Sequence, residues 1–114
     1  MGELRKHPRF AVDFGGTFSG EQFAGQGTIA NLSVGGCSIE SKVTLTAKSS
    51  LALHIQLPGS QWPLQIDRAV VRWARGNTFG VEFEQMSETD LDRLHQLIQD
   101  LEQGPLVVME RAKG

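Results

Sequence analysis

The chain contains no tyrosine, only one cysteine, and no excess of either charge sign. Its 114 residues carry 11 Lys and Arg against 13 Asp and Glu, which gives a net charge of −2. Because Cys37 has no second cysteine to pair with, no intrachain disulfide forms, and a reducing cytosol is the expected compartment. The balanced charge argues against the broad basic field of proteins that bind nucleic acid non-specifically. Any site for an anion must therefore be local.

Long apolar runs are also missing from the sequence. No segment approaches the roughly 18 apolar residues of a membrane span, and the N-terminus lacks the apolar stretch of a secretory signal. A length of 114 residues suits one domain whose modest core needs no disulfide or metal. We therefore expect a single-domain cytoplasmic protein with no membrane span, either a monomer or a weak homodimer.

The sequence lacks the usual signatures of catalysis and of metal binding. His7, His54 and His95 have no paired spacing with one another or with Cys37, so no zinc site is expected. No nucleophile elbow, P-loop or dinucleotide fingerprint is present. We therefore expect a protein that is not an enzyme, with no catalytic residues, no metal and no cofactor.

Alternating apolar and polar residues dominate most of the chain and are typical of half-buried strands. Such segments lie near residues 10–18, 23–30, 37–40, 51–57, 62–75 and 79–84. Six strands joined by short turns and rich in glycine predict a mainly β fold, a closed antiparallel barrel, since closure removes exposed strand edges. In segment 62–75 the apolar positions change from even to odd after Ile66, which indicates a β-bulge near Asp67-Arg68 and places Trp73 on the face of Val71.

The C-terminal part of the chain predicts one helix. Residues 87–90, with the sequence Ser-Glu-Thr-Asp, fit a helix N-terminus, because the serine can cap free amides and the carboxylates match the helix dipole. Apolar residues then recur at helical spacing, at Leu91, Leu94, Leu97, Ile98 and Leu101. Gly104-Pro105 is expected to end the helix. The apolar tail at 106–109 could pack on the helix, pair with a strand or mediate self-association.

Two short motifs carry the functional signal. The first is Arg5-x-x-x-Arg9, in which the guanidinium groups are planar, permanently charged donors. Pro8 disfavours helix at the preceding residue, so we interpret residues 1–9 as a mobile basic arm before the barrel and helix at 10–104 and the tail at 105–114. The second is Asn31-x-Ser33-x-x-Gly36, whose short polar side chains and glycine suit a tight turn that a ligand can approach closely.

Together, in this order and before a barrel pattern, the two motifs resemble those of the PilZ domain, RxxxR followed by (D/N)xSxxG on a small β-barrel. The segment Gly80-Val81-Glu82-Phe83 also resembles the usual last barrel strand of that family. The resemblance implies a PilZ-like split barrel and a receptor for the bacterial second messenger cyclic di-GMP.

The resemblance also implies roles for individual residues. Arg5 and Arg9 would grip guanine edges and phosphates, since a guanidinium forks onto the O6/N7 edge of guanine. Asn31, Ser33 and Gly36 would form the opposing loop. Binding would order the arm and create a surface for a downstream protein partner that controls motility, biofilm or exopolysaccharide output.

Trp73 is a further candidate for ligand binding, because aromatic faces stack on purines and Arg72 and Arg75 lie close to it in sequence. A role as a core or barrel-rim aromatic is the alternative. Leu4 departs from relatives that carry another arginine directly before the first motif arginine. Those relatives tend to bind a stacked pair of ligand molecules, so the absence of this arginine favours one bound ligand but leaves an intercalated pair as the alternative.

Other interpretations stay open. Taken singly, the first motif is ordinary surface charge and the second an ordinary turn. A PilZ-like adaptor that binds protein but no nucleotide is one alternative, although both motifs are complete at their defining positions. A small barrel that binds single-stranded nucleic acid is another. The acidic balance and the lack of a basic, aromatic-lined strand argue against it, so no nucleic-acid partner is expected.

Overall fold

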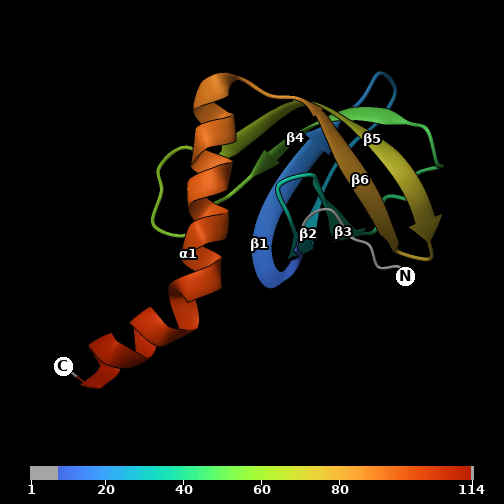
Figure 1. Cartoon of the computed structure of the whole chain (residues 1–114). Coiled ribbons are helices and arrows are strands. Elements are labelled where there is room, and N and C mark those ends of the chain that lie inside the picture. The colour runs from blue at the N-terminus through green and yellow to red at the C-terminus, as the bar shows by residue number, and fades with distance from the viewer. Residues whose placement is uncertain (1–7, 114) are drawn as a thin grey trace, which may run out of the picture.

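Six antiparallel strands form a closed barrel, and one helix lies beside it (Figure 1). The computed structural model describes residues 8–113, and the side chains of residues 8–103. Around the barrel the strands follow the order β1-β2-β3-β6-β5-β4. The elements are β1 (Phe10–Ser19), β2 (Ala24–Leu32), β3 (Gly36–Ser41), β4 (Ser50–Ile55), β5 (Leu64–Arg75), β6 (Thr78–Gln85) and α1 (Glu88–Lys113). The predicted fold class is confirmed.

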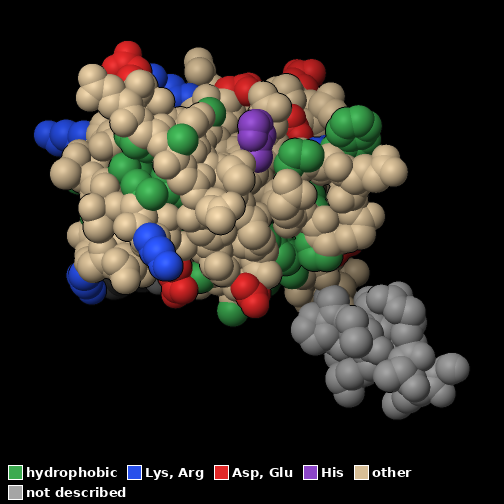
Figure 2. Space-filling model, turned by 180° about the vertical axis from the view of Figure 1, so that it is seen from behind, with side chains coloured by type: hydrophobic (Ala, Val, Ile, Leu, Met, Phe, Trp, Pro, Cys, Tyr) green, Lys and Arg blue, Asp and Glu red, His purple; other side chains and the backbone are tan. Residues whose placement is uncertain are grey.

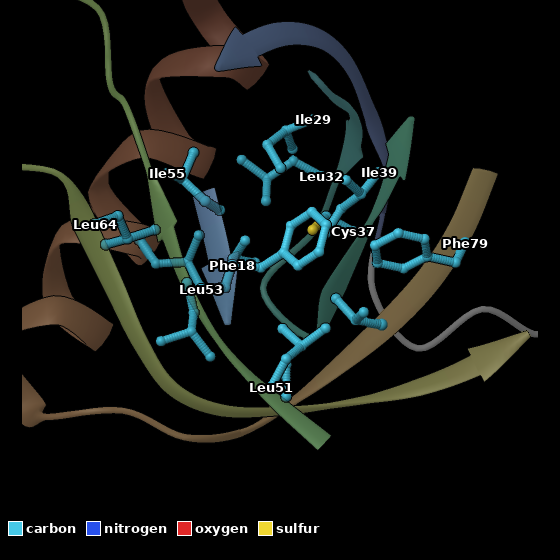
Figure 3. Close-up of a cluster of buried hydrophobic side chains, with 14 of the residues drawn as sticks. Phe18, Ile29, Leu32, Cys37, Ile39, Leu51, Leu53, Ile55, Leu64 and Phe79 are labelled. Atoms are coloured by element: carbon cyan, nitrogen blue, oxygen red, sulfur yellow. The ribbon is translucent and has the colours of Figure 1, made fainter. Parts of the chain in front are cut away.

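The alternation of apolar and polar residues turns one face of each strand into the barrel interior. In β4, Leu51, Leu53 and Ile55 are buried, with half-buried residues between them. Figure 3 shows these side chains converging from one side on Phe18, and Phe79 approaching from the other. The Phe18 and Phe79 rings meet edge to face, with centroids 5.4 Å apart. Because side chains fill the interior, a ligand has to bind on the outer surface or at the rim.

The bulge predicted at Asp67-Arg68 is present in β5. Leu53 pairs with Ile66, whereas Leu51, two residues earlier in β4, pairs with Ala69, three residues later in β5. The additional residue moves the inward face of β5 from even to odd positions. The prediction from the change of apolar parity is therefore confirmed.

A second irregularity in β5 lies at Arg72 and was not predicted. Val71 pairs with Val81 and Trp73 pairs with Gly80, so Arg72 is an extra residue on its strand. Val71 is buried, but Trp73 is 44% exposed. The expectation that Trp73 shares the face of Val71 is wrong, because this bulge turns the indole to the outer surface.

Helix α1 begins and packs as predicted. The Asp90 amide donates a hydrogen bond to the Ser87 hydroxyl at 3.1 Å, which caps the first turn. Leu94 and Ile98 are buried in the core cluster. Arg93 fastens the helix to the loop before β5, where its Nη1 and Nη2 atoms donate to two backbone carbonyls at 3.0 and 2.6 Å. The helix is thus held by an apolar face and a polar clamp.

The expectation that Gly104-Pro105 ends the helix is wrong, because α1 continues to Lys113. A proline inside a helix removes one backbone hydrogen bond and crowds the carbonyl four residues earlier, which bends a helix without always ending it. Figure 1 shows the axis of α1 changing direction toward its C-terminal end. The packing expected for side chains 106–109 lies outside the described side chains.

The surface of the described chain carries mixed charge. On the face drawn in Figure 2, Lys and Arg side chains lie apart from one another with acidic side chains near them. This agrees with the net charge of −2. Among the helical residues that the structure describes, none form a segment both long and apolar enough to cross a membrane.

The packing of α1 gives a testable prediction. Leu94→Ala should lower the free energy of unfolding by about 2–5 kcal/mol, because it leaves a cavity between the helix and the barrel. Leu91→Ala is the matched control on the same helix, since Leu91 is 38% exposed, and it should change stability by less than about 1 kcal/mol. Urea denaturation followed by circular dichroism measures both. Equal losses would contradict the docking of α1 through its Leu94 face.

Candidate functional site

The turn between β2 and β3 is held by a single buried hydroxyl. The Ser33 Oγ atom accepts hydrogen bonds from the amides of Gly35 and Gly36 at 3.1 and 3.2 Å. The Ser33 amide in turn donates to the Gly36 carbonyl at 2.9 Å. Residues 33–36 therefore form a turn whose shape is defined by hydrogen bonds within the turn itself.

Gly36 is required by a close approach between two strands. It pairs with Glu82 of β6, and a Cβ atom built at Gly36 would collide with the Val81 carbonyl oxygen. Next to it, the Phe83 amide donates a hydrogen bond to the Gly35 carbonyl at 2.9 Å. The turn is thus pressed against β6, and only glycine fits at position 36 without moving backbone.

Asn31 lies on β2, before the turn. Its Nδ2 atom donates to the Ser38 hydroxyl on β3 at 3.2 Å, and the residue is exposed. Asn31 does not line the cavity described below. Asn31 therefore makes a cross-strand contact beside the site. Unlike Ser33 and Gly36, it does not contribute to the cavity wall.

Trp73 lies over a glycine on the outer face of the barrel. A Cβ atom at Gly80 would collide with the indole Nε1 atom of Trp73, so the ring covers the Gly80 backbone. The neighbouring residues Phe79 and Val81 point into the core. The indole is thus fixed on one side by β6 and keeps an exposed surface.

One cavity of about 440 Å³ brings most of these residues together. It lies across β3, β6 and β5, beside the 33–36 turn. Its walls are formed by Arg9, Ser33, Gly35, Gly36, Cys37, Arg72, Trp73, Gly80, Val81, Glu82 and Phe83. Of the six predicted site residues, four line this cavity and Asn31 lies beside it. Arg5 lies outside the described residues.

The site predicted by sequence lacked seven residues that line this cavity, namely Gly35, Cys37, Arg72, Gly80, Val81, Glu82 and Phe83. Gly80 supports the indole, and its place opposite Trp73 depends on the Arg72 bulge. Arg72 and Glu82 form an ion pair, with 2.6 Å between Nε and Oε1. Arg72 could have been predicted from the sequence, because it precedes Trp73 directly. Its partner Glu82 could not, because nothing in the sequence indicates that the two side chains meet.

Cys37 shares the cavity wall but is chemically inert there. Burial raises the pKa of the Cys37 thiol to about 12, although the nearby positive charge of Arg9 opposes this shift. The thiol is therefore neutral near pH 7 and behaves as a small apolar side chain. Within the part of the chain that the structure describes, no three His, Cys, Asp or Glu side chains are close enough to hold a metal ion.

A second hollow of about 710 Å³ lies over β1, β2 and the end of β3. It is lined by glycines together with uncharged polar residues such as Thr17 and Gln26, and its charged lining residues are Glu40 and Lys42. It contains no residue of either motif. The smaller cavity is therefore the stronger candidate, because guanidinium groups, a tight backbone turn and an aromatic face meet there.

The chain belongs to the PilZ family. The family model described as the PilZ domain matches residues 3–100, and the barrel order, the 33–36 turn and the β3–β6 contact are described above. The resemblance expected from the two motifs is confirmed. The chain matches none of the curated proteins with which it was compared.

Several solved structures share this fold. The PilZ domain of YcgR from Escherichia coli, solved with c-di-GMP, is 14% identical with a TM-score of 0.71, and the match covers 97% of this chain and 98% of that one. The inhibitor of motility MotI/DgrA from Bacillus subtilis is 22% identical with a TM-score of 0.68, over 83% of this chain and 49% of that chain.

The MrkH–c-di-GMP complex from K. pneumonia is 16% identical with a TM-score of 0.68, over 98% of this chain and 56% of MrkH. The chain thus spans about half the length of MotI and of MrkH. At these identities the likeness concerns the fold.

The strand contact at Gly36 gives a second prediction. Gly36→Ala should lower the free energy of unfolding by about 1–3 kcal/mol, because the new methyl group has to displace the β6 backbone. Gly15→Ala is the matched control, since a Cβ atom there meets nothing within 4 Å, and it should change stability by less than about 0.5 kcal/mol. Thermal unfolding of both variants tests this. A stable Gly36→Ala protein would contradict the close contact.

Proposed function

We propose that the chain is a cytoplasmic receptor for cyclic di-GMP and is not an enzyme. The observation that carries the proposal is the cavity in which Arg9, the 33–36 turn and Trp73 meet. Membership of the PilZ family supports it, as does the presence of c-di-GMP in the structures of YcgR and MrkH. A bis-phosphate dinucleotide with two guanines matches a site that combines permanent positive charge with an aromatic face.

In this proposal each side of the site has a different task. Arg9, and Arg5 from the arm, bind guanine edges or phosphates through bidentate guanidinium contacts. The 33–36 turn, already held by Ser33, presents backbone at close range without having to refold. Trp73 stacks on a guanine, since Gly80 holds the indole in place. Asn31, with its amide on Ser38, supports the turn from β2.

Regulation follows from this division. The turn is fixed before binding by its hydrogen bonds to Ser33 and to β6, so the free energy of binding is not spent on forming it. The arm is the part that binding orders, and its ordered form offers a new surface to a downstream protein. Outputs in motility, biofilm or exopolysaccharide belong to the same proposal, and MotI, an inhibitor of motility, supports the first of them.

Calorimetric titration with cyclic di-GMP tests the role of the arm. Arg5→Ala and Arg9→Ala should each weaken binding by roughly ten- to a hundredfold, because each removes a bidentate contact of about 1–3 kcal/mol. Arg9→Lys should lose most of the same affinity, since lysine keeps the charge but not the fork. Lys42→Ala, which removes a charge from the other hollow, is the control and should bind normally.

Two outcomes would contradict the receptor. Unchanged affinity in both arginine variants would place the ligand elsewhere. A wild-type protein that folds but does not bind would favour the adaptor that works through protein contacts alone.

The proposed stacking of a guanine on Trp73 is tested separately. Trp73→Ala should weaken binding by about 1–3 kcal/mol, the contribution of one base stacked on an aromatic ring. Trp62→Ala is the matched control, because Trp62 is 71% exposed and does not line the cavity. Gly80→Ala should weaken binding as well, since its methyl group displaces the indole, and tryptophan fluorescence in a Trp62→Phe background should report that displacement. Normal binding by Trp73→Ala would remove stacking from the account.

A further inference from the structure

Arg72 is a second described arginine in the wall of the cavity, and it lies outside both motifs. The bulge in β5 makes it an extra residue between Val71 and Trp73, so Arg72 and Trp73 both lie on the exposed side of the barrel. In a regular strand the two would point to opposite faces. The same backbone irregularity thus delivers a cation and an aromatic ring to one cavity.

In the structure Arg72 is bound by carboxylates. Its Nε atom lies 2.6 Å from Oε1 of Glu82, and its Nη2 atom lies 3.5 Å from Oε2 of Glu84. Glu84 is shared, because its Oε1 atom lies 2.9 Å from the Nε atom of Arg68. The chain of ion pairs therefore runs along β5 and β6 and ends at Glu82 in the cavity wall.

Glu82 places a negative charge where an anion is expected to bind. The charged side chains that line the cavity are Arg9, Arg72 and Glu82, and the last two neutralise each other. Both members of the pair are about half exposed, at 51% and 55%. Exposed ion pairs of this kind contribute little to stability, so phosphate oxygens can compete for the guanidinium.

We propose that Arg72 binds a phosphate of the ligand and that Glu82 competes with the ligand for it. This inference rests on the proposed function, because it concerns the same cavity. On binding, the Arg72 guanidinium exchanges the Glu82 carboxylate for a phosphate, while Glu84 keeps its contact with Arg68. Glu82 then faces the ligand without its partner. The Glu82 carboxylate therefore keeps the affinity for the ligand lower than the arginines alone would make it.

Charge-neutralising variants test the competition by calorimetric titration with cyclic di-GMP. Glu82→Gln should bind about three- to tenfold more tightly at low salt, because the competitor and its repulsion are both removed. The gain should shrink in about 0.5 M salt, where exposed charges are screened. Glu40→Gln makes the same change in net charge outside this cavity and should bind as the wild type does. Arg72→Ala should bind about tenfold more weakly.

A spectroscopic measurement follows the exchange directly. The side-chain Nε–H resonance of Arg72 should shift when cyclic di-GMP is added to the wild-type protein, whereas that of Arg68, which lies outside the cavity, should stay in place. If the Arg72 resonance no longer shifts in the Arg9→Ala variant at the same ligand concentration, then the shift in the wild-type protein reports ligand bound at this site.

Two results would overturn the inference. If the Glu82→Gln variant binds cyclic di-GMP as tightly as the wild type does, or more weakly, this carboxylate does not compete with the ligand. If the Arg72→Ala variant binds with normal affinity, Arg72 does not contact a phosphate. If wild-type binding and its loss in Arg9→Ala are observed alongside either result, the receptor function stands and only this inference fails. If the wild-type protein does not bind at all, both fail.

Discussion

The close contact between the β2–β3 turn and β6 is the constraint on which the site depends. β3 and β6 are far apart in sequence, and their pairing joins the first half of the barrel to the second. Gly36 allows this pairing at its end, since any side chain there would meet the Val81 carbonyl. The same contact sets Glu82 opposite Gly36, and both residues line the cavity. The pairing of β3 with β6 therefore contributes both to the closed barrel and to the cavity wall.

A second constraint is the bulge at Arg72. In a regular β5, the side chains of the neighbouring residues Arg72 and Trp73 would point to opposite faces of the strand, and one of them would point toward the barrel interior. With one extra residue, both remain outside, and Gly80 on the paired strand leaves space for the indole. The interior is filled by apolar side chains, so the polar and charged side chains of the candidate site lie on the outer surface of the barrel.

The sequence predicted what depends on local period and composition. Alternation located the strands, the change of parity after Ile66 located one bulge, and Ser87 located the start of the helix. The sequence did not predict the bulge at Arg72, because that irregularity appears only in the pairing with β6. Too few residues of β5 follow it for the alternation of apolar residues to show a change. The end of α1 was also missed, since Gly104-Pro105 disfavours a helix without forbidding one. Motif spacing identified the Ser33 turn, whereas the carboxylate in the cavity depends on tertiary pairing.

The most direct test of the whole account is an NMR titration of the full chain with cyclic di-GMP. Chemical shift changes should concentrate at residues 4–10, at the 33–36 turn and at the Trp73 indole, while the resonances of β4 and of the second hollow should stay unchanged. Because the turn is already formed, its amides should shift without line broadening from refolding, while the arm should gain order. Shifts centred on the second hollow, or the absence of shifts at millimolar ligand, would contradict the account.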